Sequence, residues 1–246
     1  MKKERIDTIL ETLGFADSPA KAKALVMSGT VLVNEQRVEK PSETFPSDAA
    51  VRIKGDSRAA KYVSRGGVKL ERALADFEIS PQGLNCLDVG SSTGGFTDCL
   101  LQNGAIHVTC VDAGRNQLDW KLRNDPRVEV REHTNARNVG ITDFDSQFDL
   151  IVIDVSFISI TKILRSLVPL LRSGGNIISL IKPQFEVRRG EVGEGGIVVD
   201  PEKHQRVVAE ANAYAETLGL MFGGTIESPI LGARGNREFF SLYAKR

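Results

Sequence analysis

The chain has 246 residues, and its 32 lysines and arginines balance 32 aspartates and glutamates, so it carries no formal net charge. This length fits one large domain or a large domain with a small one, and the content of apolar and charged residues is typical of a soluble globular protein. A membrane span and a signal peptide are not expected, because the longest apolar run is short and contains Asp154, and the N-terminal segment is amphipathic.

The distribution of charge and the spacing of the cysteines and histidines indicate which ligands and which cellular compartment to expect. Residues 1–75 contain 14 lysines and arginines against 10 acidic residues, an excess that permits RNA binding without requiring it. Cys86, Cys99 and Cys110 show no C-x-x-C spacing, so we expect buried free thiols in a reducing cytoplasm. The three histidines are scattered and no carboxylates have ligand spacing, so no metal site is expected.

The start of the chain predicts a small domain over residues 1–55. Apolar periodicity and capping residues predict two helices, and short β-branched runs predict a hairpin and a further strand. The expected helices cover residues 4–13 and 19–28, and the expected strands cover residues 31–33, 37–38 and 51–53. Residues 56–67, rich in charged and small side chains, predict a linker.

Residues 68–246 predict a larger domain in which strands and helices alternate. Such alternation is typical of a doubly wound, mostly parallel Rossmann-like α/β sheet, whose ligands bind at the carboxyl ends of the strands. After a helix that begins near Val68, the expected strands cover residues 85–90, 106–112, 127–131, 148–154, 175–182, 221–227 and 237–244, and the expected helices cover residues 95–103, 116–123, 161–171 and 201–218.

A glycine-rich loop after the first of these strands is the main indication of a ligand. Its spacing, from Asp88 through Gly90 to Gly94, is D-x-G-x-x-x-G rather than the G-x-G-x-x-G that receives a pyrophosphate. Asp112 ends the next apolar run, where a carboxylate can accept hydrogen bonds from both hydroxyls of a ribose. The pattern favours a nucleoside cofactor such as S-adenosylmethionine over a nicotinamide dinucleotide, although glycines at such turns also occur without a cofactor.

Charged residues end two further apolar strands. Asp154 follows one strand and Lys182 the other, and since these strands should be near neighbours, their side chains could meet. Lys69 and Glu238, at the starts of other elements, could join them. A structural ion pair at the edge of the sheet and solvated surface charges are the alternative interpretations.

The chain resembles the TlyA family of bacterial ribosomal-RNA methyltransferases, which is often labelled hemolysin A. The stretches that carry the resemblance are VSRGGVKL (63–70), LDVGSSTGGFT (87–97), LRNDPRV (122–128), TNAR (134–137), DVSFIS (154–159) and KPQFE (182–186). Residues 1–60 are similar to the RNA-binding domain named after ribosomal protein S-four, except that Glu35 replaces the usual glycine after Asn34. The larger domain is similar to the FtsJ-like RNA 2′-O-methyltransferases.

The resemblance implies a two-domain enzyme that methylates a ribose, expected to be that of a cytidine, in ribosomal RNA within ribosomal subunits, in the cytoplasm and without a membrane or a metal. The implied catalytic tetrad is Lys69, Asp154, Lys182 and Glu238. Lys182 would be the base or would orient the hydroxyl, and Lys69 would lower the proton affinity of Lys182. The expected cofactor-binding residues are Asp88, Gly90, Ser91, Ser92, Thr93, Gly94, Gly95, Phe96, Asp112 and Asn135.

The small domain offers Arg5, Lys21, Lys23 and Arg37 as phosphate contacts, although each could equally be a solvated surface charge. Two other functions compete with the methyltransferase. A pore-forming or hemolytic protein would need a membrane-binding segment, and a non-catalytic RNA-binding assembly factor would have kept the fold without the activity.

Overall fold

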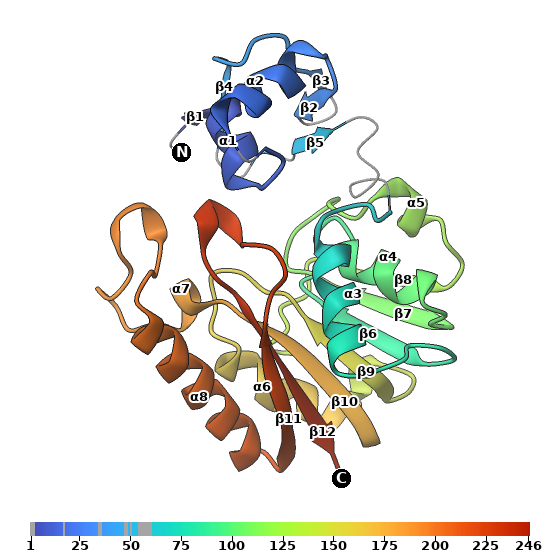
Figure 1. Ribbon diagram of the computed structural model, residues 1–246. Coiled ribbons are helices and arrows are strands. Elements are labelled where there is room, and N and C mark those ends of the chain that lie inside the picture. The colour runs from blue at the N-terminus through green and yellow to red at the C-terminus, as the bar shows by residue number, and fades with distance from the viewer. Residues whose placement is uncertain (1–2, 17, 34–35, 47–48, 50, 54–60) are drawn as a thin grey trace.

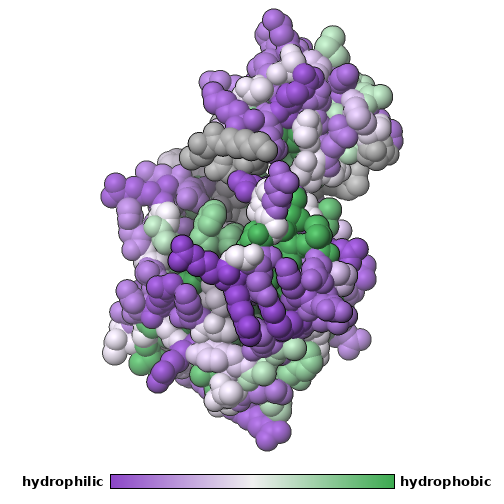
Figure 2. All heavy atoms as spheres, turned by 90° about the vertical axis from the view of Figure 1, so that its left-hand side faces the viewer, coloured by the Kyte–Doolittle hydropathy of each residue, from purple (hydrophilic) through white to green (hydrophobic). Residues whose placement is uncertain are grey.

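The computed structural model describes residues 3–16, 18–33, 36–46, 49, 51–53 and 61–246. A small N-terminal domain precedes a larger α/β domain and lies beside the end of the sheet where the parallel strands finish (Figure 1). Figure 2 shows a mostly hydrophilic side of the molecule, with apolar side chains gathered below the small domain.

The small domain packs two helices against short strands. Ile6, Leu10 and Val26 are among its fully or almost fully buried core residues. The elements are β1 (Lys3–Arg5), α1 (Ile6–Thr12), α2 (Pro19–Met27), β2 (Val31–Val33), β3 (Gln36–Arg37), β4 (Thr44–Pro46) and β5 (Val51–Ile53). The first helix is shorter than predicted because Lys3–Arg5 pair with β4 as an antiparallel strand. The turn residues 34 and 35, which include Glu35, lie outside the described residues.

The larger domain contains a seven-stranded sheet in the order β11-β12-β10-β9-β6-β7-β8. Strands β6 to β10 are parallel, whereas β12 and β11 are antiparallel, which confirms the predicted mostly parallel sheet. The strands are β6 (Asn85–Val89), β7 (His107–Val111), β8 (Val128–Arg131), β9 (Phe148–Ile153), β10 (Leu171–Ile181), β11 (Leu220–Glu227) and β12 (Phe239–Lys245). The chain order reverses between β6 and β9, and such a switch point is where these sheets bind ligands.

Helices cover both faces of the sheet (Figure 1). Helices α3 and α4 contribute to the apolar core on one face, and α6 and α8 contribute to the core on the other. The helices are α3 (Gly66–Asp76), α4 (Gly95–Gln102), α5 (Trp120–Arg123), α6 (Thr161–Leu167), α7 (Pro183–Glu186) and α8 (Pro201–Thr217). Burial on both faces explains why the central strands are almost entirely apolar.

The structure changes two predicted boundaries in this domain. Tyr62 is buried in the core of the larger domain and α3 begins at Gly66, so residues 62–67 belong to this domain rather than to a linker. Gly67 is required there because a β-carbon would clash with the Tyr62 ring. The predicted helix 116–123 is only the four-residue α5, and α7 was not predicted.

The three cysteines are free and buried, as predicted. Within the described parts of the chain, no group of three or more possible ligand side chains could hold a metal ion. No helix among the described residues is long and apolar enough to cross a membrane.

Candidate active site

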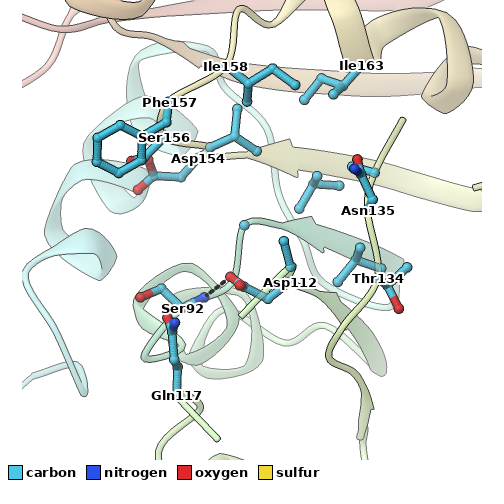
Figure 3. Close-up of a pocket in the computed structure, with 16 residues that line it drawn as sticks. Ser92, Asp112, Gln117, Thr134, Asn135, Asp154, Ser156, Phe157, Ile158 and Ile163 are labelled. Atoms are coloured by element: carbon cyan, nitrogen blue, oxygen red, sulfur yellow. Dashed lines mark hydrogen bonds between the residues drawn. The ribbon is translucent and has the colours of Figure 1, made fainter. Parts of the chain in front are cut away.

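A cavity of about 330 Å³ opens at the carboxyl ends of β6, β7 and β9. This volume lies within the usual range for small-molecule sites. Figure 3 shows that Ser92 and Asp112 form one side of it, Asp154 to Ile158 another, and Thr134 with Asn135 a third. Side chains from segments far apart in the sequence therefore converge at the switch point of the sheet.

Asp112 is fixed on the cavity wall by two backbone groups. Its Oδ2 accepts a hydrogen bond from the Ser92 N–H at 2.8 Å (Figure 3), and its Oδ1 accepts one from the Gly114 N–H at 2.6 Å. A carboxylate has about four acceptor positions, so it can still accept hydrogen bonds from two ribose hydroxyls. Asn135 lines the same cavity while its Oδ1 accepts from the Arg137 N–H at 3.1 Å, so it is both a turn residue and a cavity residue.

Gly90 also lines the cavity and has a positive φ of 85°. A β-carbon at this position would clash with the backbone carbonyl of Asp154, so only glycine allows the loop after β6 to approach the end of β9. This close approach brings the glycine loop and one tetrad residue to the same cavity.

Six of the ten expected cofactor residues do not line this cavity. Asp88 is fully buried; its Oδ2 accepts from the Thr97 hydroxyl at 2.6 Å, and its Oδ1 has no hydrogen-bond partner among the described residues. Burial raises the pKa of Asp88 to about 7. Phe96 lies in the core beside Phe240, with ring centroids 6.1 Å apart. The others are Ser91, Thr93, Gly94 and Gly95, which form or flank the start of α4.

The predicted tetrad forms two ion pairs. Lys182 Nζ lies 2.6 Å from Asp154 Oδ1 and donates a hydrogen bond to Ser156 Oγ at 3.0 Å. Lys69 Nζ, on α3, donates to Glu238 Oε2 at 2.5 Å, and both side chains are almost completely buried. Because β9 and β10 are parallel neighbours, Asp154 and Lys182 leave the sheet side by side, as predicted.

The charges of the two pairs act on one another. Burial raises the pKa of Asp154, but the charges of Lys182, Lys69 and Arg65 outweigh it and hold the pKa below its ordinary value. Burial lowers the pKa of Lys182, but Asp154 and Glu238 outweigh it, so this pKa is raised. Lys182 is therefore an ammonium at neutral pH, held next to a carboxylate.

The expectation that Lys69 lowers the proton affinity of Lys182 stays a prediction. Lys69 is engaged by Glu238, and Arg65 is a further cation, which lowers the pKa of Lys182. Arg65 immediately precedes α3. Burial lowers the pKa of Arg65, and this effect outweighs the charges of Glu238 and Asp154, which raise it. Sequence reasoning missed Arg65, although its position four residues before Lys69 in the stretch VSRGGVKL (63–70) was a usable signal.

Phe157 is a second residue that sequence reasoning left without a role. Its side chain is 91% exposed at the rim of the cavity, and its backbone has a φ of +64°. A non-glycine residue in this region costs about 1–3 kcal/mol, and such strain tends to occur at functional sites. Its position four residues after the end of β9 was the available sequence signal.

The four expected phosphate contacts are all exposed. Arg5 is engaged by Asp7, with Nη2 2.7 Å from Oδ2 and Nε 3.0 Å from Oδ1. Lys21 and Lys23 lie on α2, and Arg37 on β3 places its guanidinium against Gly29. The structure thus leaves these side chains accessible to RNA.

Comparisons with known proteins match each of the two domains to a known family. The family model described as FtsJ-like methyltransferase matches residues 62–245, and the model of the S4 domain matches residues 4–50. The chain is 42% identical over 239 residues to the 16S/23S rRNA (cytidine-2′-O)-methyltransferase TlyA of Mycobacterium tuberculosis, covering 97% of this chain and 89% of the relative.

Two further relatives carry another name. The chain is 40% identical over 240 residues to Hemolysin A of Brachyspira hyodysenteriae, covering 97% of this chain and 99% of that protein. A solved structure of a Streptococcus thermophilus protein described as a hemolysin superposes with a TM-score of 0.83 at 42% identity, covering all of this chain and 89% of the other. Relatives with both names therefore share the whole two-domain architecture.

Proposed function

Because the chain belongs to the FtsJ-like methyltransferase family, we propose that it methylates the 2′-hydroxyl of a ribose, that of a cytidine, in ribosomal RNA. Family membership confirms the predicted enzyme class and its methyl donor, S-adenosylmethionine. The observation that carries the proposal is the meeting of Asp154 with Lys182 at the edge of a cavity that also holds Asp112.

The cavity residues fit the methyl donor. Asp112 has acceptor positions left for the ribose hydroxyls, and Asn135 and Gly90 line the same cavity, where Asn135 would contact the adenine and Gly90 would allow close backbone approach. S-adenosylmethionine supplies a methyl group on a positively charged sulfonium. Transfer from this group requires the acceptor oxygen to approach in line, so the protein's main task is alignment of the two reactants.

Lys182 acts on the acceptor hydroxyl. A ribose hydroxyl is a poor nucleophile until its proton is removed or shared, and positioned acid–base groups typically contribute 10²–10⁴-fold in rate. As an ammonium, Lys182 can donate a hydrogen bond to the 2′-oxygen and stabilise the negative charge that develops there, while the hydroxyl proton passes to water as the oxygen–methyl bond forms and the sulfur–methyl bond breaks. Asp154 and Ser156 hold the Lys182 ammonium in place, and Glu238 holds Lys69.

The RNA is bound by stacking and by phosphate contacts. Proteins that act on a single nucleotide often stack an unpaired base on an exposed aromatic ring, and Phe157 offers such a ring at the rim of the cavity. The small domain lies on the same side of the sheet, so its basic residues can contact flanking RNA (Figure 1). Ribosomal RNA as substrate places the enzyme's action in the cytoplasm, and the names of the TlyA relatives support cytidine as the target.

The test is methyl transfer from labelled S-adenosylmethionine to unmethylated ribosomal subunits. We expect label on a ribose of the RNA with the wild-type protein, no label with Lys182→Ala, and wild-type labelling with Lys121→Ala, which removes an exposed lysine of α5. Cofactor binding by Lys182→Ala, measured by calorimetry, should match the wild type. Absence of label with a wild-type protein that binds the cofactor would favour the non-catalytic RNA-binding alternative, and full activity of Lys182→Ala would exclude Lys182 from the chemistry.

A further inference from the structure

The segment that follows β10 is attached to the segment that follows β9 at successive points. The first point is the ion pair between Lys182 and Asp154 at 2.6 Å. The second is a ring contact between Phe185 of α7 and Phe157, with centroids 5.1 Å apart. Because the two strands are parallel neighbours, these segments leave the sheet together and can make such contacts in register.

The third point of attachment is Glu186, the last residue of α7. Its Oε2 accepts a hydrogen bond from the Ser159 hydroxyl at 2.6 Å, and its Oε1 accepts one from the Ile160 N–H at 2.8 Å. Ile160 is the N-cap residue of α6 and has no side chain able to cap a helix. Glu186 therefore supplies, from another segment, an acceptor for the Ile160 N–H, next to the local contact in which Ser159 Oγ accepts from the Thr161 N–H at 3.2 Å.

Glu186 is partly buried, and its charge is stabilised by these donors. Burial raises the pKa of Glu186, whereas the Ser159 and Ile160 donors and the charge of Lys162 lower it, and Glu210 on α8 raises it. The pKa remains above its ordinary value as a result. Because Ser159 already accepts from the Thr161 N–H, Glu186 is not needed as the local cap of α6, and its contacts instead link the end of α7 to the end of the 154–160 loop.

The loop between the first and third attachment points, residues 154–160, carries the exposed Phe157 in its unfavourable backbone conformation. Its ring contacts Phe185, the residue before Glu186 in α7, so the conformation is maintained by this contact and by the ends of the loop. Asp154 anchors one end through Lys182, and Glu186 anchors the other end through Ser159 and Ile160.

We propose that Glu186 is a positioning residue, which holds the 154–160 loop so that Phe157 stands ready to receive the base of the target nucleotide. The inference rests on the proposed function, in which Phe157 stacks against that base. Glu186 itself touches neither the RNA nor the methyl donor. Its removal should therefore weaken productive RNA binding and leave cofactor binding intact.

The first experiment compares steady-state kinetics of Glu186→Ala, Phe157→Ala and the double variant on unmethylated ribosomal subunits. We expect Glu186→Ala to raise KM for the subunits about tenfold, with the affinity for S-adenosylhomocysteine within twofold of the wild type. Residues that act through one another are not additive, so Glu186→Ala should cause little further loss when Phe157 is already alanine. Additive losses, or a parallel loss of cofactor affinity, would show a merely structural role and overturn the proposal.

Two other variants serve as controls. Glu186→Gln keeps one acceptor oxygen in nearly the same volume, so it should show a smaller rise in KM, and it keeps the test open if the alanine variant folds poorly. Glu191→Gln removes the same charge five residues further on, where Glu191 pairs with Arg206 of α8. It should leave both KM and cofactor affinity unchanged.

The second experiment does not depend on RNA. Chymotrypsin cleaves after exposed aromatic residues, so its rate of cleavage after Phe157 reports how firmly the loop is held. We expect Glu186→Ala to be cleaved at least about fivefold faster than the wild type and than Glu191→Gln. An unchanged cleavage rate would overturn the positioning role whatever the activity, whereas a wild-type protein that binds cofactor but methylates no subunit would overturn only the proposed function.

Discussion

Asp154 controls the protonation of Lys182, and replacing it with asparagine should reverse the direction of the lysine's pKa shift. The groups that face Lys182 are Asp154, Ser156, Glu238 and Arg65. Burial and Arg65 lower the pKa of Lys182, and Asp154 makes the larger of the two contributions that raise it above the ordinary 10.5. Without the Asp154 charge, burial should dominate and the pKa should fall below that value.

The size of the change follows from the geometry of the pair. Two unit charges 2.6 Å apart interact by about 6 kcal/mol at an effective dielectric constant of about 20. One pKa unit corresponds to about 1.4 kcal/mol, so the upper limit is a fall of about four to five units. Because the Asp154 side chain is 24% exposed, water screens part of this interaction. We therefore expect a fall of about two to three units.

The assay is a ¹⁵N NMR titration of the lysine ammonium groups, with the Lys182 signal assigned by its loss in Lys182→Arg. The Lys182 midpoint should lie above pH 10.5 in the wild type and below pH 10.5 in Asp154→Asn. Asp149→Asn is the matched control, because Asp149 lies at the opposite end of β9 and pairs with Arg172. An Asp154→Asn midpoint at or above that of the wild type would refute the reasoning.

The direction of the Lys182 pKa shift also determines how the free energy of unfolding changes with pH, which can be measured. In the wild type the folded pKa of Lys182 is raised, so its contribution is complete below pH 10.5 and is lost as the pH rises through the folded pKa. In Asp154→Asn the folded pKa is depressed, so the unfolded state binds more protons between that depressed pKa and pH 10.5. The free energy of unfolding of the variant, relative to the wild type, should therefore rise with pH in that window by up to about 1.4 kcal/mol per pH unit.

Two further substitutions probe the other parts of the site. Lys69→Met leaves the Glu238 carboxylate buried without its partner, so it should lower the free energy of unfolding in urea by roughly 3–5 kcal/mol. Lys69→Met combined with Glu238→Gln should recover much of this stability. A negligible loss in the single variant would contradict a tightly coupled pair. Asp112→Ala should weaken S-adenosylhomocysteine binding about 30- to 150-fold, from about 2–3 kcal/mol of charged hydrogen bonds to a ribose, with Asp125→Ala, at a surface ion pair, as the control. Equal affinities in calorimetry would remove Asp112 from the cofactor site.

The sequence located the centre of the site because of how a parallel sheet is built. Asp154 and Lys182 each end an almost wholly apolar run, and apolar runs of this kind form buried parallel strands. All parallel strands present their carboxyl ends at one edge, so charged residues at those ends are brought together without further information. The 2.6 Å separation of Asp154 and Lys182 follows from the adjacency of β9 and β10.

Other parts of the site could not be predicted in this way. Lys69 and Glu238 are 169 residues apart and begin different kinds of element, so nothing local indicates that they pair. The role of Arg65 depends on where the start of α3 lies relative to the site. That position depends on the packing of the buried Tyr62 against Gly67. Similarly, β1 forms only because β4 is available as a partner, which local helical periodicity does not reveal.

The glycines of the site show how one sequence signal can have two physical causes. The glycine loop after β6 predicted a ligand cradle, yet the clash at Gly90 would be with the backbone of Asp154 rather than with a ligand. Gly232 has the same relation to the other tetrad carboxylate, because a β-carbon there would clash with Glu238. The two positions differ, because Gly90 has a φ of 85° that favours glycine, whereas Gly232 has an ordinary φ of −73° and only the Glu238 side chain stands in the way of a β-carbon. Replacing either glycine with alanine should displace the tetrad carboxylate before it affects the cofactor, so these positions belong to the catalytic geometry as much as to cofactor binding.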